Sequence, residues 1–194
     1  RIILQLWHMG RVVHPYFLGG ELPVSASATR APGHAHTPEG RKENVEARPL
    51  RLAEMPRIVD DYGHAAENAK LAGFDGVQLH GANGYLIDQF LRNSSNLRDD
   101  DYGGIPENRV RLMREVMERL VAIWGADRVS IRLSPNGDSQ GVDDSDPATL
   151  FAEAARVLEA LKVSFVELRQ PGPEGTFGAT TVPPQDHVIR AHYS

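Results

Sequence analysis

The sequence contains no cysteine in its 194 residues. Disulfide bonds, thiolate nucleophiles and cysteine-ligated zinc or iron–sulfur sites are therefore excluded within these residues. A chain without disulfides fits a reducing compartment, and we expect a cytoplasmic location.

Long apolar runs and basic blocks are also missing. No apolar run reaches the roughly 20 residues of a membrane-spanning helix, so no membrane partner is expected. The 21 basic and 26 acidic side chains give a net charge of −5, which does not favour binding to nucleic acid. Hydrophobic residues make up 41% and charged residues 24% of the chain, a balance typical of a globular domain with a packed core.

Several familiar site motifs are absent too. The glycines of "GANG" and "DYGG" lack the spacing of a phosphate-binding loop, and no serine stands in a nucleophile elbow. His34 and His36 in "HAH" lie between turn residues, with no third ligand at metal-binding spacing. We expect these histidines in an exposed loop and predict no metal site.

Short β-branched runs alternate with longer amphipathic stretches along the chain. The runs predict strands, and apolar residues three and four apart predict helices. Helix starts are marked by Pro56, by Pro106 and by Asp146 followed by Pro147. This alternation favours an α/β fold with parallel strands joined by right-handed crossovers. The predicted strands cover residues 2–7, 76–79, 128–133 and 164–168.

The chain is short for a closed barrel of such units, which needs roughly 250 residues. It begins at Arg1 and enters the apolar run "IILQLW" at once. We therefore interpret residues 1–194 as one incomplete domain from a longer protein. Residues 10–52, rich in Pro, Gly and Ser, far exceed the usual connection of about 2–6 residues and predict a capping segment after the first strand.

Polar side chains follow the second predicted strand in "LHGANGYLIDQF", where His80, Asn83 and Tyr85 stand within six residues. Ligands of parallel α/β folds gather at the carboxyl ends of strands. His80 and Asn83 can donate two hydrogen bonds to one acceptor atom, and Tyr85 can add a proton donor. Spacing alone leaves packing at the strand end as an equally good interpretation.

Two polar residues interrupt apolar strands. Gln5 lies between Leu4 and Leu6, and an unpaired buried amide there costs roughly 1–3 kcal/mol. Arg132 brings a full charge into a strand and needs an anion or several carbonyl acceptors. A ligand satisfies this need, and so does an internal salt bridge to Glu167 on the next strand.

The motifs "LQLWHMGR", "GFDGVQLHGANGYLIDQFLRNSSNLRDDDYGG" and "VSIRLSPNG" resemble, in order and spacing, those of the Old Yellow Enzyme family of FMN-dependent ene-reductases. The resemblance implies a TIM (β/α)8 barrel, of which this chain supplies about four parallel βα units, strands 3 to 6. It also implies reduction of electron-poor C=C bonds in small molecules such as enones and nitroalkenes, with hydride from NAD(P)H passing through FMN.

The resemblance also implies roles for individual residues. Gln5, Arg132 and His80 match cofactor-binding positions, and Trp7 matches a residue that shapes the substrate pocket. His80 and Asn83 match the pair that holds the substrate oxygen, while Tyr85 matches the acid that protonates the substrate carbon.

Two alternatives remain open at this point. One is a 2,4-dienoyl-CoA reductase of the same superfamily, whose iron–sulfur ligands would lie largely outside these residues. The other is a non-catalytic fragment of a barrel, in which the site residues are idle. Four βα units cannot close a barrel, so we expect residues 1–194 alone neither to retain FMN nor to turn over.

Overall fold

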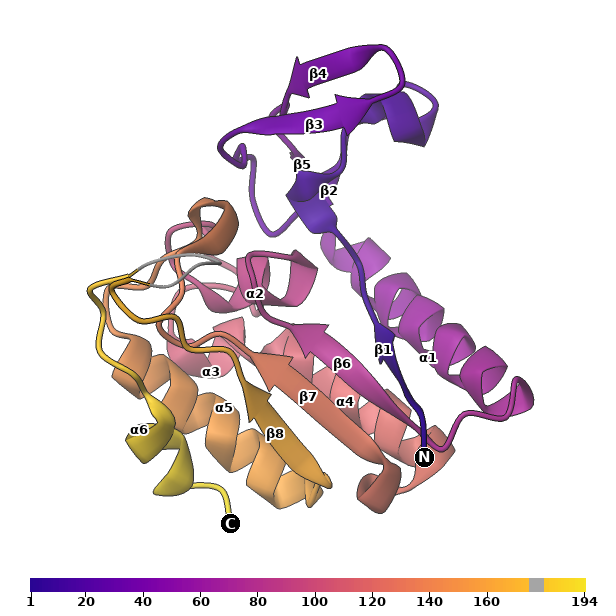
Figure 1. Cartoon of the computed structure of the whole chain (residues 1–194), viewed down its shortest axis with the longest axis vertical. Coiled ribbons are helices and arrows are strands. Elements are labelled where there is room, and N and C mark those ends of the chain that lie inside the picture. Colours follow the sequence, from indigo (N-terminus) through magenta and orange to yellow (C-terminus); the bar gives the residue numbers. More distant parts are fainter. Residues whose placement is uncertain (175–179) are drawn as a thin grey trace.

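A computed structural model of the chain describes residues 1–174 and 180–194. Its centre is a sheet of four parallel strands in the order β1-β6-β7-β8 (Figure 1). Each of the four predicted strands is present, and the predicted α/β class is confirmed. The strands are β1 (Ile3–Leu6), β6 (Gly76–Gly81), β7 (Val129–Leu133) and β8 (Phe165–Leu168).

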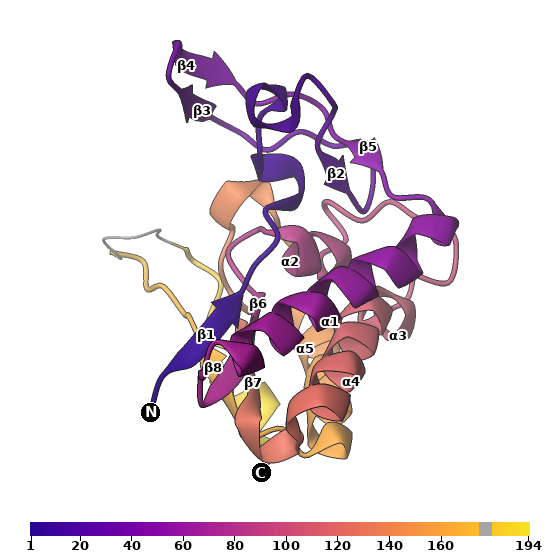
Figure 2. The same cartoon turned by 90° about the vertical axis from the view of Figure 1, so that its right-hand side faces the viewer.

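The long helices lie together on one face of the sheet (Figure 2). Helix α1 packs against α4, and α4 packs against α5. The predicted helix starts are confirmed, since Pro56 lies in the first turn of α1 and the Asp146 carboxylate accepts a hydrogen bond of 3.1 Å from Thr149 N at the start of α5. The helices are α1 (Met55–Leu71), α2 (Leu86–Leu91), α3 (Pro106–Arg109), α4 (Arg111–Trp124), α5 (Pro147–Leu161) and α6 (Asp186–Arg190).

The two faces of the sheet differ in polarity. Side chains that alternate along the strands, such as Leu79 and Ile131, are fully buried against the helices. The residues between them face the other way, and there Gln5 and Arg132 contact polar neighbours on adjacent strands. This alternation follows from the two-residue period of a strand, and it gathers the polar strand residues on the face that the long helices leave open.

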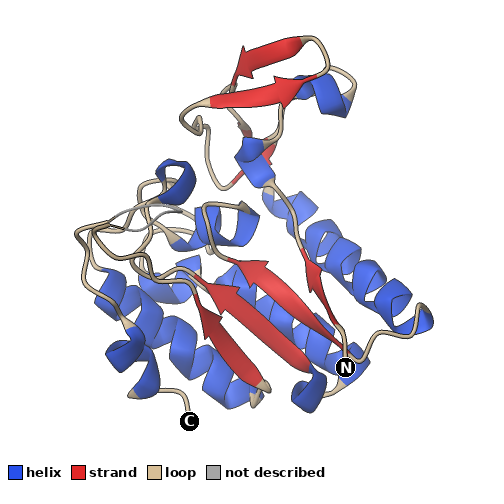
Figure 3. Cartoon of the chain, in the orientation of Figure 1, coloured by secondary structure: helices blue, strands red, loops and turns tan. Residues whose placement is uncertain are grey.

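Residues 10–52 form a separate layer on the side of the carboxyl ends of the strands (Figure 3). Strand β2 (Val24–Ser25) pairs with β5 (Arg48–Pro49), and β3 (His34–Thr37) forms an antiparallel hairpin with β4 (Gly40–Glu43). The prediction that His34 and His36 lie in a loop was wrong, because both belong to strand β3. Both are exposed, as expected.

Arg98 ties the base of this layer to the loop after α2. Its guanidinium donates to the carbonyl oxygens of Ala26 at 2.9 Å and Leu50 at 2.6 Å. Asp100 holds the same guanidinium in a two-point ion pair at 2.9 and 2.5 Å. Because this arginine has three partners in fixed directions, it holds the residue after β2 and the residue after β5 close together.

Gln89 in α2 connects three further segments and is fully buried. Its Oε1 accepts from Arg11 N at 3.1 Å and from Ser25 Oγ at 2.9 Å. Its Nε2 donates to Met9 O at 3.2 Å and to Gly84 O at 2.7 Å. One amide thus joins the loop after β1, the strand β2 and the loop after β6.

Replacing Gln89 with Met should lower the free energy of unfolding of the full-length protein by about 2–4 kcal/mol, because it leaves several buried backbone groups without partners. Denaturant unfolding measures this change. Asn68→Ala removes an amide from an exposed position of α1 and should change stability by no more than about 0.5 kcal/mol. Equal stability of the two variants would contradict the role assigned to Gln89.

Candidate active site

The carboxyl ends of the four parallel strands lie at one edge of the sheet, beneath residues 10–52 (Figure 1). Trp7 follows β1, His80 lies near the end of β6, and Tyr85 follows β6 as the residue before α2. The strand register pairs His80 with Arg132 on β7. The structure therefore brings together residues from three strand ends that are far apart in the sequence.

Three rings form a cluster at this edge. The Trp7 and His80 rings stack with centroids 6.0 Å apart. The Tyr85 ring lies in T-shaped contact with both, with its centroid 4.7 Å from that of Trp7 and 5.1 Å from that of His80. Trp7 is 52% exposed, so the cluster has an open side.

His80 has a defined protonation state and tautomer. Burial lowers its pKa below the ordinary 6.5, and the positive charge of Arg132 lowers the pKa further. The ring is therefore neutral at pH 7. Its Nδ1 accepts a hydrogen bond of 3.3 Å from Ala82 N, which leaves the proton on Nε2. His80 thus presents a neutral N–H donor.

Asn83 takes a backbone conformation that few residues adopt. Its φ is +59°, and that of Gly84 is +76°, so the chain turns sharply after β6. Only glycine fits the second position, because a Cβ there would lie 2.2 Å from Ser139 O. Asn83 N donates to Ser134 Oγ at 2.8 Å, whereas the side-chain Oδ1 is buried without a partner among the described residues.

A chain of polar side chains crosses the open face of the sheet. Gln5 Nε2 donates to Gln78 Oε1 at 2.6 Å, and Gln78 Nε2 donates to Glu167 Oε2 at 3.1 Å. Arg132 Nη2 lies 3.2 Å from Glu167 Oε1, so the internal salt bridge is formed. The side chains of Arg132 and Glu167 are 32% and 41% exposed.

Sequence reasoning missed Gln78 and Asp88 as parts of this site. Gln78 had a visible signal, because it stands two residues before His80 and so shares its face of the strand. Asp88 had a weaker signal. It stands four residues before Arg92, and oppositely charged residues four apart on a helix can form an ion pair. Ser134 lies in the loop after β7, and its partners come from the loop after β6 and from α2.

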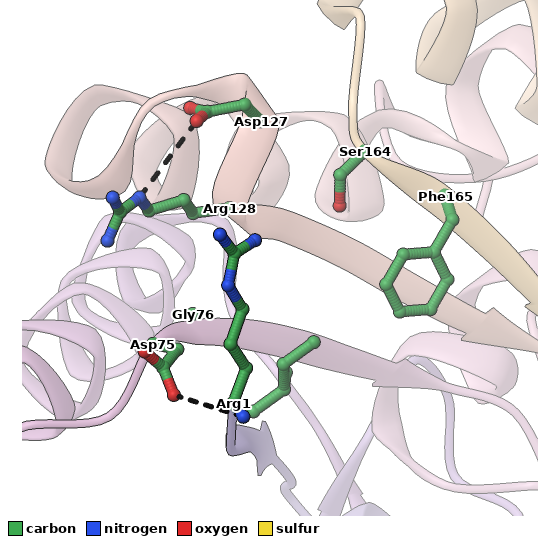
Figure 4. A pocket seen from close by; sticks show the side chains of 8 residues that line it. Arg1, Asp75, Gly76, Asp127, Arg128, Ser164 and Phe165 are labelled. Carbon is green, nitrogen blue, oxygen red and sulfur yellow. Dashed lines mark ion pairs between the residues drawn. The ribbon is translucent and has the colours of Figure 1, made fainter.

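A cavity lies at the opposite end of the strands, near their first residues (Figure 4). Its charged groups form ion pairs with one another, Asp127 with Arg128 at 3.9 Å and the amino group of Arg1 with Asp75 at 4.0 Å. Sites of parallel α/β folds lie at the other end of the strands, so we assign no function to this cavity.

Within residues 1–174 and 180–194, no group of three or more His, Asp or Glu side chains is arranged to hold a metal ion. No helix in this part of the chain is long and apolar enough to cross a membrane.

Solved structures of high similarity cover the whole chain. The Old Yellow Enzyme homologue of Zymomonas mobilis is 50% identical with a TM-score of 0.96, and the match covers 100% of this chain and 54% of that one. Morphinone reductase is 35% identical with a TM-score of 0.90, covering 100% and 53%. These neighbours are TIM barrels, which confirms the prediction that the chain is part of such a barrel.

Curated relatives of similar sequence are also flavin oxidoreductases or 12-oxophytodienoate reductases. The 12-oxophytodienoate reductase 1 of Oryza sativa is 47% identical over 150 residues, 76% of this chain and 38% of that protein. The flavin oxidoreductase hxnT of Emericella nidulans is 40% identical over 178 residues, 88% and 45% respectively. The chain thus spans less than half the length of these relatives. The family model described as NADH:flavin oxidoreductase / NADH oxidase matches residues 1–189, and the chain belongs to that family.

Proposed function

We propose that the full-length protein containing this chain is an FMN-dependent ene-reductase that reduces electron-poor C=C bonds of small molecules with hydride from NAD(P)H. The observation that carries the proposal is the placement of His80 and Tyr85 beside Trp7, at the end of the open sheet face that bears Gln5 and Arg132. The relatives named above include reductases of 12-oxophytodienoate and of morphinone, which favours this class over a 2,4-dienoyl-CoA reductase.

Residues of the sheet fit the polar edge of a flavin. Arg132 Nε is buried without a hydrogen-bond partner among the described residues, and Gln5 uses only one amide hydrogen on Gln78. Gln5, Arg132 and His80 would hold FMN, and the positive charge of Arg132 would stabilise the negative charge that the flavin gains on reduction. When bound, FMN supplies hydride transfer between NAD(P)H and the alkene.

The substrate oxygen would be bound by His80 and Asn83. The neutral His80 offers Nε2–H, and the side-chain NH2 of Asn83 would be the second donor; its Oδ1 is buried without a partner among the described residues. Two donors on one carbonyl or nitro oxygen withdraw electron density from the conjugated double bond. The Tyr85 hydroxyl would then deliver a proton to the carbon next to the polarised group.

The remaining assignments describe the setting of this site. Trp7 would limit the width of the substrate pocket through its ring contacts with His80 and Tyr85. Residues 10–52 would cap the barrel mouth, and residues 1–194 would form a single incomplete FMN-binding domain. A cytoplasmic location stays a prediction.

Tyr85→Phe should slow reduction of cyclohexenone by about 10²–10⁴-fold, the usual contribution of a general acid. Reduction of the bound flavin by NADPH should stay unchanged, because the acid is not needed there. Stopped-flow absorbance of the full-length protein separates the two half-reactions. If the alkene step proceeds at the wild-type rate in the variant, Tyr85 is not the acid.

Replacing His80 or Asn83 with Ala should each weaken cyclohexenone binding by about tenfold, because each change removes one donor to the ligand oxygen. Titration followed by flavin absorbance measures the affinity. The matched control is Asn68→Ala on the exposed side of α1, which should bind with wild-type affinity. Wild-type affinity in both site variants would show that the oxygen is held elsewhere.

A polypeptide of residues 1–194 made alone should not retain FMN, because the strands β1, β6, β7 and β8 form an open sheet rather than a closed barrel. Flavin absorbance of the purified polypeptide tests this expectation. Stoichiometric flavin in that polypeptide would refute it.

A further inference from the structure

The carboxylate of Asp88 lies at the centre of a buried network next to the site. Asp88 is fully buried, and its Oδ2 accepts from Gly84 N at 2.9 Å and from Ser134 Oγ at 3.2 Å. Its Oδ1 accepts from Arg92 Nε at 2.9 Å. Each oxygen of this buried charge therefore has a partner, as burial of a carboxylate requires.

Arg92 holds Ser134 from the other side. Its side chain is 1% exposed, and while Nε pairs with Asp88, Nη2 donates to the backbone oxygen of Ser134. The hydroxyl and the carbonyl of Ser134 are thus fixed by one ion pair. Neither group can turn away without leaving a buried charge with a missing partner.

The hydroxyl of Ser134 both donates one hydrogen bond and accepts another. It gives its proton to Asp88, so its oxygen can only accept further bonds, and it accepts one of 2.8 Å from Asn83 N. Ser134 follows β7 and Asn83 follows β6, so this bond ties the ends of two neighbouring strands together.

Asn83 depends on this tie for its orientation. Its φ of +59° lies in the left-handed region, which costs a non-glycine residue roughly 1–2 kcal/mol. Its Oδ1 is buried without a partner among the described residues, so the direction of the amide depends on the backbone conformation and on packing. The one backbone N–H of Asn83 is the group that Ser134 holds.

We propose that Ser134, oriented by Asp88 and Arg92, is a positioning residue that aims the Asn83 amide at the substrate oxygen. The inference rests on the function proposed above. Tyr85 is held separately, since its own N–H donates to Ala82 O at 3.3 Å and the preceding Gly84 N bonds directly to Asp88. Loss of the Ser134 hydroxyl therefore affects binding of the substrate oxygen and spares proton delivery.

The test uses the full-length FMN-loaded protein and its Ser134→Ala variant. The dissociation constant of cyclohexenone, followed by flavin absorbance, should rise about tenfold, while kcat at saturating cyclohexenone should fall far less than in Tyr85→Phe, because proton delivery is spared. In an Asn83→Ala background the same change should have no further effect on affinity, because Ser134 acts through Asn83. A structural role alone would give neither result.

Ser130→Ala is the matched control. Ser130 lies on β7, the strand that Ser134 follows, and is buried, but its Oγ has no partner among the described residues, so affinity should remain that of the wild type. The positioning role would be wrong if the effects of Ser134→Ala and Asn83→Ala on the dissociation constant multiplied in the double variant. It would also be wrong if the Ser134→Ala protein lost its flavin or its fold. A wild-type protein that does not bind cyclohexenone would overturn the proposed function together with it.

Discussion

The buried ion pair between Asp88 and Arg92 is the interaction on which the site depends. Removing two charges from water costs several kcal/mol per ion, and a pair of this kind is not a strong source of stability by itself. What it provides is geometry. Because both charges must keep their partners, the loop after β6 and the loop after β7 are fixed relative to α2.

Helix α2 is short, yet it organises the edge of the sheet through two adjacent residues. Asp88 holds the two loops that follow β6 and β7, and Gln89 holds the loop after β1 and the strand β2. These contacts are buried amide and carboxylate hydrogen bonds, in which a missing partner costs more than a formed bond gains. The edge therefore behaves as one rigid unit, which suits a site that must hold a ligand atom between fixed donors.

The open face of the sheet carries polar side chains that are linked to one another. Gln5, Gln78, Glu167 and Arg132 form a continuous polar chain across the four strands. The sequence alone left a ligand and an internal salt bridge as equal explanations for Arg132. The structure shows the salt bridge and also an unpartnered Arg132 Nε, so the two explanations are compatible rather than exclusive.

The sequence by itself determined the strands, the helix starts and the α/β class, because these follow from local periodicity and from residues such as Asp146 and Pro147 at a helix N-terminus. It also pointed to His80, Asn83 and Tyr85, through motifs whose residues are neighbours in the chain. The misplaced His34 and His36 show the limit of local signals, since turn residues around them fit a hairpin as well as a loop.

Only the tertiary structure decided the tautomer of His80, the left-handed turn at Asn83, and the parts played by Gln78, Asp88 and Ser134. Each of these depends on which atoms from distant segments meet in a space without water. A single sequence carries no direct record of such long-range contacts, because the free energy that fixes them arises only when the segments pack together.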